Sequence, residues 1–299
     1  MASKRRTYTG SPGSAGWIES GTSIEVEESG NGDRQVVAVR NPNDGTVLDV
    51  SSFPLQVARG LITGVSSVNK FGKAPSGVQT TLTDIWSRAD AAATQQIWLA
   101  PTAARIHTIV SSDALDTGFT VRIYGLKTWA TAETTEDIAL TGTTGVPTAN
   151  SYVIIHRMKI IPTLAKPANV GTITVTAAAP DSTVTAVILP GEGQTEMAIY
   201  GVPSTQDFYM TRWGCAMGKE VTAQSVNFTL RVNENPNVQT TGYVLKNDLG
   251  VLSVGASSID KTFTNPIKYA GPCIIKVQGL ASTADVDAKA AFDGYLVTK

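Results

Sequence analysis

The sequence is poor in the residues that carry metal-binding and redox chemistry. Its 299 residues include only two cysteines and two histidines. A structural zinc site needs about four cysteine or histidine ligands at characteristic spacings, whereas Cys215 and Cys273 lie far apart in the chain. We therefore predict no metal site and two free, buried thiols, with a disulfide between them as the alternative.

An excess of charge of one sign is also lacking. The 24 lysines and arginines nearly cancel the 25 aspartates and glutamates, which leaves a formal net charge of -1. Because phosphate binding requires a surplus of cations on the contact surface, a chain-wide attraction to nucleic acid is excluded, and we expect no direct contact with it. Since hydrophobic residues make up 42% of the chain, disorder of the whole chain is excluded as well.

Long apolar runs are absent too. No stretch approaches the ~18 consecutive apolar residues that span a membrane. The basic residues 1–6 lead into threonine, serine and glycine rather than into the apolar segment of a secretory signal. We therefore expect a soluble protein without a membrane partner, made and kept inside a cell, in the cytoplasm, until assembly.

No catalytic motif accompanies either histidine. His107 and His156 each lie in an apolar stretch with a strand-like pattern, and no Gly-x-Ser-x-Gly elbow is present. We interpret both as structural residues, and we expect neither catalytic nor cofactor-binding residues in this chain. The acidic residues form two clusters that we interpret as solvated charges: Glu25, Glu27 and Glu28, and Glu133, Glu136 and Asp137.

What the chain does contain is threonine, valine and isoleucine in short, alternating runs. These residues fit a pleated, half-buried surface, so they favour strands. Many short strands separated by glycine- and proline-rich turns predict an all-β protein with a jelly-roll or β-sandwich body, built as one large or two stacked sandwiches. The expected strands are 105–111, 119–126, 136–141, 152–161, 172–177, 184–189, 196–202, 208–215, 225–232, 243–246, 273–278 and 292–298.

The first 54 residues differ from the rest of the chain. They are small and polar, except for two strand-like runs at 25–27 and 35–39. The sequence Gly-Asn-Gly-Asp at 30–33 favours a hairpin between these runs, because asparagine and glycine accept positive φ. We predict an extended N-terminal arm over 1–54 that carries a small hairpin, and a β body over 55–299. A polar break near 180–183 suggests a subdivision of the body.

The arm also holds the residues that we consider for partner binding. A short basic cluster can contact phosphate, dock on an acidic protein surface, or simply remain solvated, which is the default interpretation. The candidate partner-binding residues are Lys4, Arg5, Arg6, Tyr8 and Trp17.

Several stretches of the body, taken in order, resemble virion structural proteins of tailed phages from marine and other environmental sources. They include 57–60, 68–72, 84–86, 121–126, 140–144, 152 with 156–158, 193–200 and 294–297. The resemblance implies a place in the phage particle rather than an enzymatic activity. A near-neutral, threonine-rich β protein with a polar arm is similar to the capsid decoration (cement) proteins, which implies a homotrimer that binds the major capsid protein on the capsid surface.

Two other classes of function stay open. A tail component, such as a tube, fibre or spike protein, would also be a β-rich structural protein. A receptor- or glycan-binding module on the virion surface could use aromatic rings for stacking. The tryptophans that motivate this alternative are spread along the chain: Trp17, Trp86, Trp98, Trp129 and Trp213.

Overall fold

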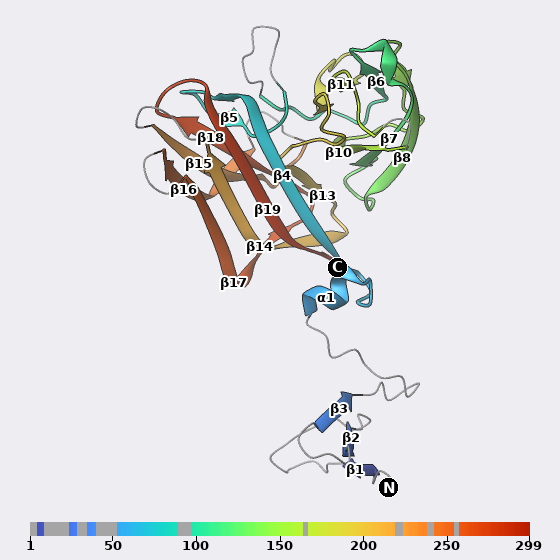
Figure 1. Ribbon diagram of the computed structural model, residues 1–299, viewed down its shortest axis with the longest axis vertical. Helices are drawn as coiled ribbons and strands as arrows, with labels where there is room; N and C mark the ends of the chain where they lie inside the picture. Colours follow the sequence, from blue (N-terminus) through green and yellow to red (C-terminus); the bar gives the residue numbers. More distant parts are fainter. Residues whose placement is uncertain are drawn as a thin grey trace. The chain divides into compact units, whose positions relative to one another are not determined.

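The computed structural model describes residues 53–88, 97–163, 167–218, 224–237, 242–253 and 257–299, together with the backbone of three earlier strands (Figure 1). The chain divides into two compact units, Met1–Thr63 and Gly64–Lys299.

The first unit contains a small antiparallel sheet. Strands β1 (Arg5–Tyr8), β2 (Ile24–Glu28) and β3 (Gln35–Val39) follow one another in the order β1-β2-β3, and helix α1 (Phe53–Ala58) comes later in the same unit. The antiparallel pairing of β2 with β3 confirms the strand pair predicted for the arm, and β1 adds a third strand. The predicted turn at 30–33 lies outside the described residues.

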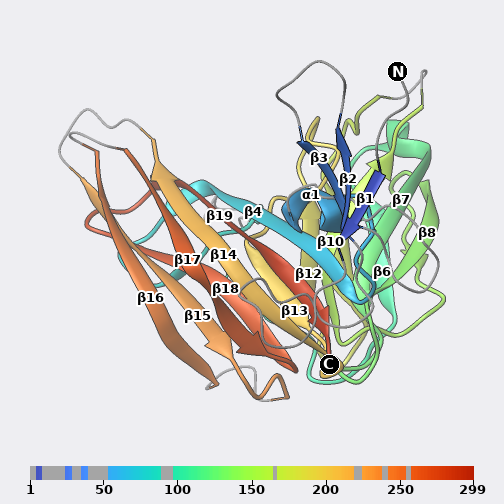
Figure 2. The same ribbon diagram turned by 90° about the horizontal axis from the view of Figure 1, so that it is seen from below.

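Most strands of the second unit form what we call the enclosing sandwich, in which two antiparallel sheets face each other across one hydrophobic core (Figure 2). Its largest buried side chains are Phe208, Trp213, Phe228 and Phe292. One sheet has the order β17-β14-β19-β4, with β4 (Val65–Val78), β14 (Gln206–Met217), β17 (Ser258–Ala270) and β19 (Val286–Thr298). The other has the order β13-β18-β15-β16, with β5 beside β18; its strands are β5 (Thr83–Asp84), β13 (Ile199–Val202), β15 (Ser225–Asn233), β16 (Tyr243–Leu252) and β18 (Cys273–Ala281).

A second sandwich, which we call the inserted sandwich, is formed by the chain between β5 and β13 (green and yellow in Figure 1). Its strands alternate as the sequence predicts: Phe119, Val121 and Ile123 of β7 are buried, whereas the residues between them are only partly buried. One sheet has the order β10-β7-β8, with β7 (Thr117–Leu126), β8 (Thr134–Thr141) and β10 (Ile154–Ile161). The other has the order β12-β11-β6-β9, with β6 (His107–Ser111), β9 (Val146–Pro147), β11 (Ile173–Ala177) and β12 (Val184–Ile188); a 3-10 turn, η1 (Ala114–Asp116), precedes β7.

The structure confirms the all-β class and shows two sandwiches in the body. The polar break at 180–183, considered as a subdivision, instead joins β11 to β12, which pair in one sheet. The chain therefore does not leave the inserted sandwich there; it enters between β5 and β6 and leaves between β12 and β13. The polar character of 180–183 reflects a turn within a sheet rather than a boundary between domains.

Both cysteines are free and buried, as expected. Burial raises the pKa of the Cys215 and Cys273 thiols to about 12. Neither thiol is therefore ionised near neutral pH, so both behave as small apolar core residues.

A buried ion pair lies where the chain leaves β5. Lys276 Nζ of β18 is 2.9 Å from Asp84 Oδ1, and both side chains are almost fully buried. Asp84 Oδ2 also accepts a hydrogen bond of 2.9 Å from the backbone nitrogen of Trp98, and the Lys276 ammonium lies 4.2 Å from the Tyr243 ring centroid. One carboxylate thus joins the enclosing sandwich to the segment that leads into the inserted one.

Removal of one member of this pair is expected to be costly. In Asp84→Asn, Lys276 stays buried without its counter-ion, so we expect a loss of about 3 kcal/mol or more in the free energy of unfolding, measured by denaturant titration. The matched control is Arg122→Gln, which breaks the exposed pair of Arg122 with Asp137 and should change stability little. Equal effects of the two substitutions would contradict this account.

Candidate functional site

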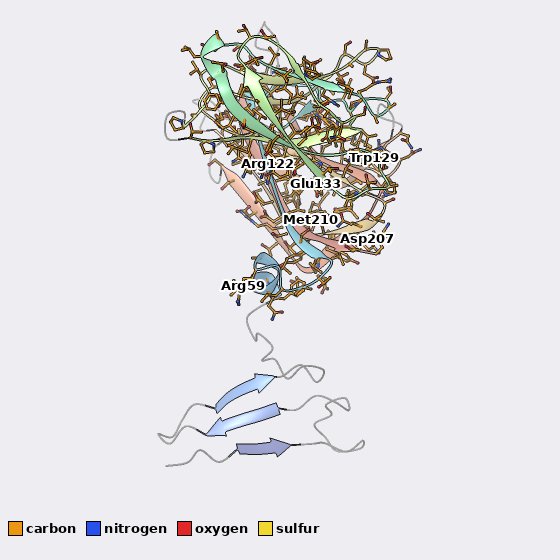
Figure 3. The ribbon with its side chains drawn as sticks, turned by 90° about the vertical axis from the view of Figure 1, so that its right-hand side faces the viewer. Arg59, Arg122, Trp129, Glu133, Asp207 and Met210 are labelled. Atoms are coloured by element: carbon orange, nitrogen blue, oxygen red, sulfur yellow. The ribbon has the colours of Figure 1, made fainter. Side chains whose placement is uncertain are left out.

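A polar cavity of about 350 Å³ lies between the two sandwiches. The enclosing sandwich contributes residues of β4, β13 and β19, and the inserted sandwich contributes residues of β7, β10 and the connection that precedes β8. That connection carries Trp129 and Glu133, both labelled in Figure 3. The cavity is the place where ionisable side chains from both sandwiches meet.

A histidine–glutamate pair lies at the centre of this cavity. His156 Nε2 of β10 is 2.5 Å from Glu133 Oε2. Burial lowers the pKa of His156 more than Glu133 raises it. Burial by itself raises the pKa of the Glu133 carboxyl. The hydrogen bond from His156 and the neighbouring Lys70 and Arg157 lower this pKa by more, so it lies below its usual value. The pair therefore consists of a neutral imidazole that donates from Nε2 to an ionised carboxylate.

Two cationic side chains connect β4 to β10 beside this pair. Lys70 of β4 is buried, and its Nζ donates a hydrogen bond to the backbone oxygen of His156. Burial, together with the charge of Arg157, holds the pKa of Lys70 well below its ordinary value. Arg157 Nη2 in turn donates to the backbone oxygen of Asn69, at 2.7 Å. Each sandwich thus supplies a cation that bonds to the backbone of the other.

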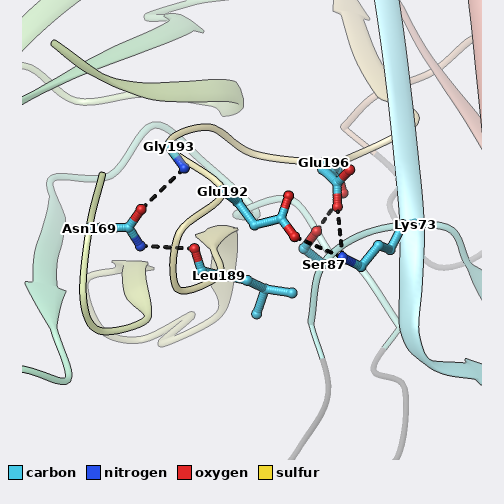
Figure 4. Close-up of polar contacts among 7 residues, drawn as sticks. All are labelled: Lys73, Ser87, Asn169, Leu189, Glu192, Gly193 and Glu196. Atoms are coloured by element: carbon cyan, nitrogen blue, oxygen red, sulfur yellow. Dashed lines mark hydrogen bonds and ion pairs between the residues drawn. The ribbon is translucent and has the colours of Figure 1, made fainter. Parts of the chain in front are cut away.

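A second set of polar contacts fixes the segment that leaves the inserted sandwich (Figure 4). Lys73 Nζ of β4 lies 2.8 Å from Glu192 Oε1 and 3.4 Å from Glu196 Oε2. The Asn169 side chain donates to the oxygen of Leu189 at 2.8 Å and accepts from the nitrogen of Gly193 at 3.1 Å. These contacts hold both ends of the turn at 189–193 in place.

The geometry of the cavity is that of a binding or bracing site. A catalytic histidine orients its ring through one nitrogen and presents the other to a nucleophile. In the part of the chain that the structure describes, His156 uses Nε2 for Glu133, while Nδ1 is buried and has no hydrogen-bond partner. Over the same residues, no group of three or more histidine, cysteine or acidic side chains could hold a metal ion.

His156 and Glu133 belong to separate patterns in the sequence, and the structure brings them together. The alternation of apolar and polar residues indicates neither this contact nor a role for Lys70, because the strand that holds Lys70 is not among the predicted strands. Segments that carry the resemblance do supply Lys70, His156 and Arg157, as well as Tyr124 and Tyr200, to the cavity lining. Of the partner-binding candidates, Arg5, Arg6 and Tyr8 lie on β1, and Lys4 and Trp17 lie outside the described residues.

Comparisons with known proteins give no family for this chain. No protein-family model, no curated protein and no solved structure matches it. Within the described residues, no helix is long and apolar enough to cross a membrane. The resemblance to phage virion proteins therefore remains an expectation.

The two histidines make the stability of the fold depend on pH. Burial lowers the pKa of His107 to about 4, and burial also lowers the pKa of His156. Between pH 7 and 5 the unfolded chain gains protons on residues that stay neutral in the fold. The free energy of unfolding should therefore fall as the pH is lowered, with a slope approaching about 1.4 kcal/mol per pH unit for each histidine that stays neutral.

Denaturant titrations at several pH values between 7 and 5 measure this slope. His107→Gln removes one of only two histidines, so its stability should depend less on pH than that of the wild-type chain. The carboxylates with lowered pKa values titrate below this window. An unchanged slope in His107→Gln would show that His107 is protonated normally in the fold.

Proposed function

We propose that this chain is a structural protein of a phage virion, and specifically a capsid decoration protein that binds the outer surface of the assembled head. In this proposal the larger unit sits on the head as a homotrimer, and the N-terminal unit contacts neighbouring major capsid proteins. The protein acts without enzymatic turnover and without a cofactor.

The observation that carries the proposal is the division of the chain into two compact units. The second unit is a large double sandwich, and the first has a small three-stranded sheet of its own. A binding protein of this kind can use one unit as a rigid base and the other as a separate point of attachment. The resemblance of the body to virion structural proteins agrees with such a role.

The polar chemistry of the cavity also favours a structural role. Lys70 and Arg157 bond to backbone groups across the junction of the two sandwiches, and His156 bonds to Glu133 within the inserted sandwich; none of them bonds to an activated hydroxyl or thiol. Their contribution is to hold the double sandwich in one arrangement. A rigid unit of this kind suits a protein that must fit a fixed lattice of capsomers.

The physical mechanism of stabilisation is mass action. A protein that binds the assembled shell but not its separate subunits lowers the free energy of the shell, by an amount that grows with its free concentration relative to Kd. A trimer adds avidity, because the second and third contacts become intramolecular once the first is made. Three contacts that are each weak can thus hold the trimer firmly on the shell.

Co-sedimentation with phage heads that have been stripped of this protein tests the proposal, together with the native mass of the free protein. We expect saturable binding by a trimer. The full-length variant with Lys4→Gln, Arg5→Gln and Arg6→Gln should bind more weakly, because each lost cation removes a contact to the capsid surface. Lys246→Gln, an exposed substitution in the second unit, is the matched control and should bind as the wild type does.

Other outcomes would redirect the proposal. Binding to tails, or polymerisation into tubes, would identify a tail component and contradict the decoration role. Saturable binding of heads that is unaffected by the triple substitution would retain the head location and overturn the role of the basic cluster.

A further inference from the structure

Two opposite charges line the junction cavity without neutralising each other. Among the described residues, Glu133 accepts a hydrogen bond from the neutral imidazole of His156, through Oε2. Arg157 uses Nη2 for the backbone oxygen of Asn69. Glu133 Oε1 and Arg157 Nη1 take part in no hydrogen bond within the described part of the chain, so an acceptor and a donor are both available to a ligand.

Hydroxyl groups complete the polar lining. Ser66, on the same face of β4 as Lys70, and Tyr200 line the cavity, and their hydroxyls have no hydrogen-bond partner among the residues that the structure describes. A hydroxyl can donate one hydrogen bond and accept others, so these groups adapt to either kind of partner. The lining therefore offers an acceptor-only carboxylate, a donor-only guanidinium and several groups that do both.

This combination discriminates between classes of ligand by charge. An anion would lie near the ionised Glu133, and a cation would lie near Arg157, so each would meet repulsion in a partly buried site. A neutral ligand with adjacent hydroxyls avoids both penalties, since one hydroxyl can donate to Glu133 while its neighbour accepts from Arg157. The charges of the cavity favour a polyol over a charged metabolite.

The size of the cavity and its aromatic residues narrow the class of ligand further. The volume of about 350 Å³ is near the lower end of the range of roughly 300–1,000 Å³ that is usual for small-molecule sites. The rings of Tyr124 and Tyr200 give the lining apolar surface, against which the C–H groups of a sugar ring can pack. One or two pyranose rings would satisfy both the polar and the apolar parts of the lining.

We propose that the cavity between the two sandwiches binds a neutral pyranose, as the free sugar or as the end of a glycan. In this site Glu133 accepts from one ring hydroxyl and Arg157 donates to its neighbour, while Tyr200 lines the apolar side. The built features of the site are the buried His156, which bonds to Glu133, the buried Lys70, which bonds to the backbone of His156, and the backbone oxygen of Asn69, which accepts from Arg157. The proposal does not depend on binding to phage heads.

Saturation-transfer NMR and calorimetric titration of the full-length protein test this assignment. The probes are D-glucose, D-galactose, D-mannose and N-acetyl-D-glucosamine, with D-glucuronate as the anionic and D-glucosamine as the cationic comparator. We expect at least one neutral sugar to bind with a Kd of about 1 mM or tighter, and to bind more tightly than either charged comparator.

Substitutions locate the bound sugar. Glu133→Gln and Arg157→Gln should each weaken binding about tenfold or more, because a hydrogen bond to a charged group is lost. Asp137→Asn is the matched control, since its carboxylate pairs with Arg122 outside the cavity, and it should bind as the wild type does. Ser66→Leu places a larger side chain in the site from an exposed position on the same face of β4 as Lys70, and it should abolish binding with an unchanged melting temperature.

Three results would overturn the proposal. They are the absence of binding by every neutral sugar at about 50 mM, well above the expected Kd; tighter binding of glucuronate or glucosamine; and binding that survives both Ser66→Leu and Glu133→Gln. Head binding measured on the same variants separates this outcome from the fate of the virion proposal, because neither substitution lies in the N-terminal unit.

Discussion

The close approach of two chain connections to Gly72 is the constraint on which the architecture of the larger unit depends. Ala198 N donates to Ile85 O at 3.0 Å, and Ser87 N donates to Glu196 O at 2.9 Å. The segments that enter and leave the inserted sandwich therefore pair with each other. A Cβ at position 72 would overlap the backbone of both Ile85 and Ala198, so only glycine lets the paired segments lie on β4.

The pairing of these two segments at Gly72 determines which side chains meet at the junction between the sandwiches. Trp86, Met197 and Ile199 are close to the paired segments, and their side chains belong to the core of the inserted sandwich. Ile85 and Ala198 of the same segments belong instead to the core of the enclosing sandwich, so neighbouring residues of the paired segments enter both cores. The charged groups at the same place must then be paired or bonded, because burial without a partner is costly, and Lys70 and Lys276 meet this requirement in different ways.

The same constraint explains why the polar cavity is suited to binding. Arg157 is held by a contact with the other sandwich and Glu133 by the buried His156, so both charges have hydrogen-bond partners before any ligand arrives, which lowers the entropic cost of binding. Contacts at this junction join the two sandwiches. In the roles proposed above, such a junction would suit attachment to a regular surface and recognition of a small neutral ligand.

The sequence allowed prediction of most strands but not of the site. Runs such as 119–126 alternate clearly, and the structure confirms them. β4 and β17 were missed because Gly72, Pro75 and Pro266 interrupt otherwise polar runs. The contacts of the cavity join residues far apart in the chain, such as Lys70 and His156, and no local pattern records which strands will meet.

The most direct test of this account is native-state hydrogen exchange on Gly72→Ala, with Gly250→Ala as the control. A Cβ at position 250 meets nothing within 4 Å. Because a Cβ at position 72 pushes against backbone, the account predicts a loss of about 1–3 kcal/mol in protection, shared by amides of β7 and β14, while Gly250→Ala changes protection much less. Unchanged protection in Gly72→Ala, or a loss confined to β4, would contradict the claim that this contact holds the two sandwiches together.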